Sequence, residues 1–129
     1  MRRRPAAVLI AGIVIALLAP VGADARRHRP HRPPRPTLPR AAAIAEREWD
    51  VHSSRPRVAA GPVVLTVTND GEDDHDLTVA GPAGAVGRVL LGPGETATLL
   101  VDLPPATYRL YCSLPGHESL GMATTIRAS

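Results

Sequence analysis

Residues 107–122, TYRLYCSLPGHESLGM, join an alternating segment to a loop that carries three metal-binding side chains. In the alternating segment every second residue falls on one face, as in a half-buried strand, so the Cys112 thiol is expected to point inward. His117 and Met122 follow Cys112 at successive intervals of five residues. The residues predicted to share the inward face are Tyr108, Leu110 and Cys112. The stretch therefore predicts a strand that delivers a thiol to a loop holding an imidazole and a thioether.

A second imidazole, His75, occurs upstream in a polar turn. With Cys112, His117 and Met122 it completes a set of two histidines, one cysteine and one methionine, which is typical of mononuclear copper sites with a weak axial methionine. Thiolate and thioether suit Cu(I), whereas imidazole also binds Cu(II), so such a site can pass single electrons. The sequence therefore predicts one copper ion per chain, held by these four residues.

Two stretches of the chain resemble the cupredoxins, the plastocyanin-like small blue type 1 copper proteins. One is 107–122, and the other is 61–79, where GPVVLTVTNDG leads to HDLTV. The Cys-x4-His-x4-Met spacing is similar to that of the rusticyanin and auracyanin branches and is longer between Cys and His than in plastocyanin. The resemblance covers about residues 48–129 and implies a Greek-key β-sandwich with copper held between loops at one end.

The sequence departs from the family pattern beside the ligands. In many cupredoxins an Asn follows the first histidine ligand, and its backbone N–H bonds the cysteine sulfur. Asp76 occupies that position here, so we expect the backbone donor to remain while the side chain differs. Pro115 lies in the ligand loop and has no N–H to donate to the sulfur.

Each candidate ligand has an ordinary role when it is considered alone. His75 could be a solvated loop histidine, His117 a turn residue, and Cys112 or Met122 a small core side chain. Their joint occurrence between strand-like flanks favours copper. His52 lies in a predicted strand and matches no ligand position.

Other uses of the cysteine fit the sequence less well. A structural zinc site is usually closed by four Cys or His ligands, and a thioether is a poor zinc ligand. A binuclear copper centre needs a second cysteine, whereas the chain has one. A cysteine hydrolase needs an orienting group and an oxyanion hole, which no feature of the sequence singles out. We expect an electron carrier rather than an enzyme; the alternatives are a copper-binding or copper-delivery protein of the same fold and a non-redox interaction module.

The rest of the candidate domain predicts short strands separated by Gly and Pro turns, which is typical of an all-β sandwich. No long segment of the domain shows a helical period, although Ala41–Trp49 could begin with a turn of helix. The core must be aliphatic, because the chain contains no Phe. Further predicted strands cover 63–68, 77–79, 89–91, 96–101 and 123–127.

The N-terminal part predicts export. Residues 1–25 combine three arginines, an apolar segment and a small-x-small cleavage site, which is typical of a signal peptide; an uncleaved membrane anchor is the alternative. Residues 26–43 are expected to form a Pro/Arg-rich disordered tether, and 44–129 a copper-binding domain. The location is then periplasmic, cell-surface or secreted. Copper ligation also explains a lone cysteine outside the cytoplasm.

Charge is distributed unevenly along the chain and bears on the partners. The formal charge is +3 overall, but residues 41–129 hold six Arg and eleven acidic residues, a balance of −5. Nucleic-acid binding is therefore not expected. The basic segment 26–40 is either a solvated linker or a contact for an anionic membrane surface. The acidic residues around His75, including Glu72, Asp73 and Asp74, form either an ordinary solvated turn or a surface that steers a basic redox partner, such as a c-type cytochrome or a membrane oxidase or reductase. The protein is expected to be a monomer.

Overall fold

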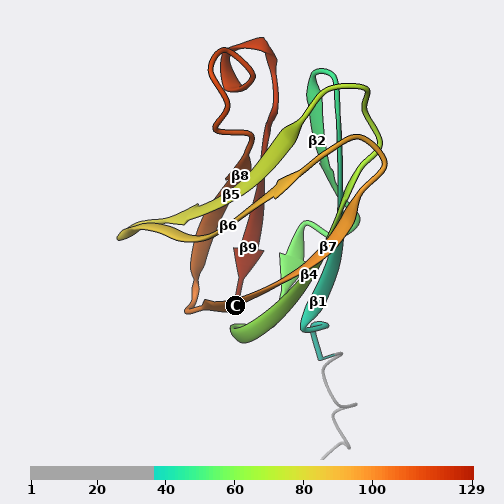
Figure 1. Ribbon diagram of the computed structural model, residues 1–129. Helices are drawn as coiled ribbons and strands as arrows, with labels where there is room; N and C mark the ends of the chain where they lie inside the picture. The colour runs from blue at the N-terminus through green and yellow to red at the C-terminus, as the bar shows by residue number, and fades with distance from the viewer. Residues whose placement is uncertain (1–36) are drawn as a thin grey trace, which may run out of the picture. The chain divides into compact units, whose positions relative to one another are not determined.

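The computed structural model describes residues 37–129, and nine strands and one short 3-10 helix lie in that range (Figure 1). The predicted signal peptide and the tether up to residue 36 lie outside the described residues. No helix in the described part of the chain is long and apolar enough to cross a membrane. The elements are β1 (Ala41–Arg47), β2 (Asp50–Ser53), β3 (Arg57–Val58), β4 (Gly61–Asn69), β5 (His75–Gly81), β6 (Gly84–Leu91), β7 (Thr96–Leu103), β8 (Ala106–Tyr111), η1 (Glu118–Leu120) and β9 (Ala123–Ala128).

The strands form two sheets that face each other across one core. One sheet has the order β2-β1-β4-β7 and the other has the order β3-β9-β8-β5-β6. The chain crosses between the sheets after β2, β3, β4, β6 and β7, so sequence neighbours are not always hydrogen-bonded neighbours. The all-β Greek-key sandwich predicted from the sequence is confirmed.

Alternating burial explains why these segments are strands. In β4 the side chains of Val63, Leu65 and Val67 are buried, while Val64 and Thr66 between them are exposed. This is the two-residue period of a strand that covers a core on one face. The inward face predicted for β8 is confirmed, since Tyr108, Leu110 and the following Cys112 are all buried.

The prediction of a helical turn at the start of Ala41–Trp49 is wrong. Residues 41–47 form β1, which pairs in parallel with β4 and antiparallel with β2. Three consecutive alanines favour a helix locally, but two neighbouring strands satisfy the β1 backbone, and burial of Ala42 and Ile44 outweighs that local preference. Strand structure therefore begins at Ala41, inside the segment that the sequence assigns to the tether.

Loops that carry the candidate ligands meet at one end of the sandwich, at the top of Figure 1. The β4–β5 loop leads into His75, and the loop from β8 to β9 holds Cys112, His117 and Met122. The short β1–β2 turn reaches the same end (Figure 1). The fold thus brings together three segments that are far apart in the sequence.

Candidate metal centre

The loop between β8 and β9 is closed by its own backbone. The Cys112 N–H donates to the Met122 carbonyl oxygen at 3.1 Å, and the Met122 N–H donates to the His117 carbonyl oxygen at 3.2 Å. Gly116 has φ of +86°, a left-handed conformation that glycine adopts without strain. These bonds fix the backbone at all three predicted ligand positions of the loop.

His75, Cys112 and His117 form a compact cluster of donor atoms. His75 Nδ1 lies 3.3 Å from His117 Nδ1, and Cys112 Sγ lies 3.5 Å from His117 Nδ1. One donor atom from each residue falls within 4.8 Å of the others. Donor atoms that share one transition-metal ion lie about 3–4 Å apart, because each bond to the metal is about 2.0–2.3 Å long. The spacing and the donor types therefore fit a single metal ion.

The fourth predicted ligand, Met122, is fully buried at the end of the same loop. The backbone of Met122 is hydrogen-bonded to the backbones of Cys112 and His117, two residues of the cluster. His52 is exposed on β2 and belongs to no cluster of ligating side chains among residues 37–129. The structure thus brings together the two histidines and the cysteine named from the sequence and leaves His52 outside.

The Cys112 sulfur is buried and receives the backbone donor expected from the sequence. The Asp76 N–H donates to Cys112 Sγ at 3.4 Å. Burial raises the pKa of the Cys112 thiol, and the backbone hydrogen bonds from Asp76 and Leu114 only partly oppose that effect. A bound cation would favour the thiolate over the thiol, so metal binding and deprotonation of Cys112 are coupled.

The Asp76 carboxylate ties the start of the ligand loop to β5. It accepts hydrogen bonds from the Ser113 N–H, from the Ser113 hydroxyl at 2.6 Å and from the Arg88 guanidinium. Burial alone would raise the pKa of Asp76, but the Ser113 and Arg88 bonds outweigh it and lower that pKa. Both oxygens of the Asp76 carboxylate therefore have hydrogen-bond partners.

Two residues of the β1–β2 turn contact the histidines, and neither was singled out from the sequence. Glu48 Oε1 lies 3.1 Å from His75 Nε2. The same oxygen accepts the N–H groups of Glu72 at 2.8 Å and of Asp73 at 2.9 Å. The bond from the Asp73 N–H is the largest of several effects that lower the pKa of Glu48 to about 2.

Trp49, the other residue of this turn, meets the second imidazole edge to face. Its ring centroid lies 5.0 Å from that of His117, with an interplanar angle of 87°. Trp49 is 40% exposed, Leu120 is 56% exposed, and His117 is half-buried. Trp49 and Leu120 therefore expose apolar surface beside His117, the more exposed of the two histidines in the cluster.

Glu46 is a buried carboxylate whose oxygens have no hydrogen-bond partner among the described residues. Burial, with a smaller contribution from the negative charge of Asp76, raises the pKa of Glu46 to about 7. Once residues 41–47 are known to form β1, the two-residue period places Glu46 on the inward face with Ala42 and Ile44.

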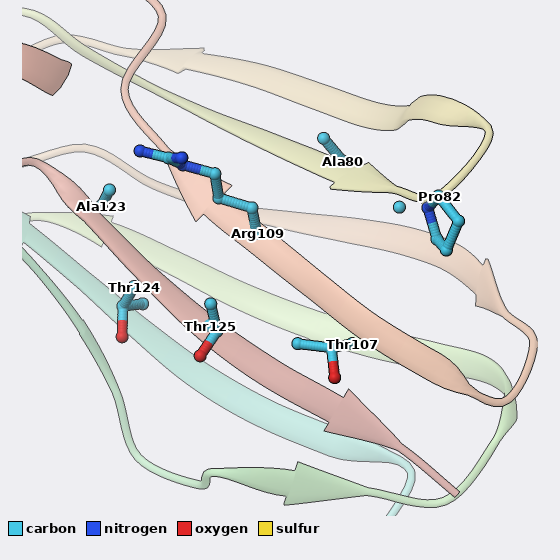
Figure 2. A pocket seen from close by; sticks show the side chains of 8 residues that line it. Ala80, Pro82, Thr107, Arg109, Ala123, Thr124 and Thr125 are labelled. Atoms are coloured by element: carbon cyan, nitrogen blue, oxygen red, sulfur yellow. The ribbon is translucent and has the colours of Figure 1, made fainter.

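A shallow hollow of about 570 Å³ lies on the outer face of the five-stranded sheet (Figure 2). Thr107 and Thr125 project from β8 and β9 on its floor, and Arg109 and Pro82 border it (Figure 2). None of its lining residues belongs to the histidine and cysteine cluster. Arg109 is also ion-paired with Glu118, so its charge is already balanced.

Three solved structures share this fold. Dithionite-reduced auracyanin from Roseiflexus castenholzii aligns with a TM-score of 0.61 at 18% identity, over 71% of this chain and 98% of that chain. Auracyanin A, titled a "blue" copper protein from Chloroflexus aurantiacus, aligns with a TM-score of 0.56 at 18% identity, over 70% of this chain and 99% of that chain. Auracyanin B aligns with a TM-score of 0.58 at 18% identity, over 73% of this chain and 91% of that chain.

At this level of identity the likeness establishes the fold, which is the cupredoxin-like sandwich implied by the sequence resemblance. No protein-family model and no curated protein sequence matches the chain.

Proposed function

We propose that this chain is an exported, monomeric type 1 copper protein that carries single electrons between redox partners and is not an enzyme. The observation that carries the proposal is the convergence of His75 Nδ1, His117 Nδ1 and Cys112 Sγ within 4.8 Å at one end of an auracyanin-like sandwich. Met122, buried in the same loop, would supply the weak axial thioether.

The chemistry of the donor set fits copper. Thiolate and thioether are soft ligands, imidazole is intermediate, and no carboxylate belongs to the cluster among the described residues. Copper held by such a set supplies one-electron chemistry by alternating between Cu(I) and Cu(II). The protein's part is to keep the donors in one arrangement, and both Cys112 and His75 are fully buried and hydrogen-bonded from outside the cluster.

The exposed side of the cluster is a suitable port for electron exchange. His117 is half-buried, and Trp49 and Leu120 expose apolar surface at the same end. Glu72, Asp73 and Asp74 are all exposed in the loop that leads to His75. Together these features favour a basic redox protein, such as a c-type cytochrome or a membrane oxidase or reductase, docking at this end.

A copper-delivery protein is the second candidate, because the half-exposed His117 would also give a copper acceptor access to the site. The two functions differ in whether copper leaves. An electron carrier loaded with one equivalent of copper should pass through repeated cycles of reduction and oxidation with unchanged copper content. Transfer of most of the copper to a Cu(I) chelator of moderate affinity after a single reduction would instead support delivery.

A further inference from the structure

The β1–β2 turn contacts the His75 imidazole from the side away from the cluster. We propose that Glu48 is a positioning residue that fixes the tautomer and the orientation of His75, so that Nδ1 faces the metal position before any metal binds. This inference rests on the proposed function for its purpose, but its geometry concerns only residues of the chain.

The Glu48 carboxylate is held by groups other than the histidine. Its Oε1 accepts the N–H groups of Glu72 and Asp73 at 2.8 and 2.9 Å. A carboxylate oxygen that already accepts two backbone N–H groups carries no proton of its own. In its third contact, with His75 Nε2 at 3.1 Å, Glu48 Oε1 is therefore again the acceptor. The proton of the neutral imidazole must therefore lie on Nε2.

The bare nitrogen of His75 then faces the cluster. Its Nδ1 lies 3.3 Å from His117 Nδ1, whereas Nε2 is bound to Glu48. Histidine ligands commonly donate their other N–H to a carboxylate or carbonyl, which fixes the ring and makes the ligating nitrogen more basic. Here a single carboxylate oxygen does so while it also orders the loop that precedes His75.

Gly71 leaves the space that this contact requires. A Cβ at this position would overlap Glu48 Oε1 and stand 2.8 Å from His75 Nε2. Gly71 has no left-handed φ, so alanine can adopt its backbone conformation. Gly71→Ala should therefore force the Glu48 carboxylate and the His75 imidazole apart while the charge of Glu48 stays on the chain.

The turn is also held against the other histidine. Trp49 packs edge to face on His117 at 5.0 Å between ring centroids. A Cβ at Gly121 would lie 2.9 Å from the Trp49 carbonyl oxygen, so the ligand loop passes close to the turn. These contacts keep Glu48 from moving away from His75 independently of its own hydrogen bonds.

The test measures the His75 tautomer in the metal-free full chain by nitrogen NMR, under conditions where the spectrum itself shows a neutral imidazole. The wild type and Glu48→Gln should carry the proton on Nε2, because the glutamine carbonyl oxygen also accepts. Glu48→Ala and Gly71→Ala should show mixed tautomers. Asp102→Ala, which removes an exposed charge on β7, should match the wild type.

Copper affinity, measured by competition with a chelator, gives the second readout. Loss of such a partner typically weakens metal binding 10–100-fold, and we expect that loss in Glu48→Ala and Gly71→Ala but not in Asp102→Ala. A wild-type proton on Nδ1, or wild-type tautomer and affinity in both Glu48→Ala and Gly71→Ala, would overturn the inference. A wild-type chain that shows the Nε2 tautomer yet binds no copper would contradict the proposed function alone.

Discussion

Replacement of the buried Glu46 by glutamine should remove a pH dependence of folding that the wild type shows. Glu46 lies on the inward face of β1, and its carboxylate oxygens have no partner among residues 37–129. Burial raises its pKa from an ordinary 4.5 to about 7. Glutamine has nearly the same shape but does not titrate, so the substitution isolates the effect of the proton.

The magnitude follows from the difference in pKa between the folded and unfolded chains. One pKa unit corresponds to 1.36 kcal/mol, so a rise from 4.5 to about 7 corresponds to about 3 kcal/mol. Below pH 4.5 Glu46 is protonated in both states, so its ionisation does not change the free energy of unfolding there. Between pH 4.5 and 7 the unfolded chain loses its proton first, so the free energy of unfolding falls as pH rises. Above about pH 7 the full cost is present.

Urea unfolding of the metal-free chain at pH 5 and at pH 8 provides the assay. From pH 5 to pH 8 the free energy of unfolding of the wild type should fall by about 2–3 kcal/mol more than that of Glu46→Gln. Most of the pH range between the unfolded and folded pKa values of Glu46 lies between these two measurements. Asp102→Asn, an amide substitution at an exposed position of β7, should behave as the wild type does. Equal changes in the wild type and in Glu46→Gln would refute the account of Glu46 as a buried acid that is protonated in the folded state near neutral pH.

Three further predictions concern the copper site and its surface. Cys112→Ser should abolish the intense thiolate-to-copper charge-transfer band of the Cu(II) protein. A full band in this variant would show that the band does not come from the Cys112 thiolate, the only thiol of the chain. Met122→Gln and Met122→Leu should keep copper and shift the reduction potential in voltammetry, because the axial bond is weak; complete loss of copper from both would contradict a purely axial role. Conversion of Glu72, Asp73 and Asp74 to amides should lower the rate of electron transfer with a basic cytochrome and make that rate less dependent on salt. The reason is that exposed charges are screened over about 8 Å at physiological ionic strength. A rate that is independent of salt in both the wild type and the variant would exclude steering by these acids.

The ligand cluster was predictable because most of the sequence features that indicate it lie within one short stretch of the chain. Cys112 and His117 lie in one loop, and the period of β8 sets the direction of the thiol. His75 could be added because Leu77 and Val79 alternate with polar residues in the sequence that follows it, and because this stretch resembles a known family. The backbone donor from Asp76 to the sulfur was expected for the same reason and is present at 3.4 Å.

The residues behind the ligands were not predictable in this way. Glu48 meets His75 across 27 positions of sequence, through a turn whose path depends on the pairing of β1 with β2. That pairing was hidden because the alanines of β1 favour a helix when only their neighbours in sequence are considered. Without β1 as a strand, neither the burial of Glu46 nor the approach of Trp49 to His117 could be inferred.

The most direct test of the central claim is the visible and EPR spectrum of the purified chain during titration with Cu(II). We expect an intense charge-transfer band from the Cys112 thiolate that saturates at one equivalent, together with a single Cu(II) species in the EPR spectrum. A weak visible spectrum typical of Cu(II) bound by nitrogen and oxygen ligands alone, or no binding at one equivalent, would contradict the claim that His75, Cys112 and His117 hold a type 1 copper ion.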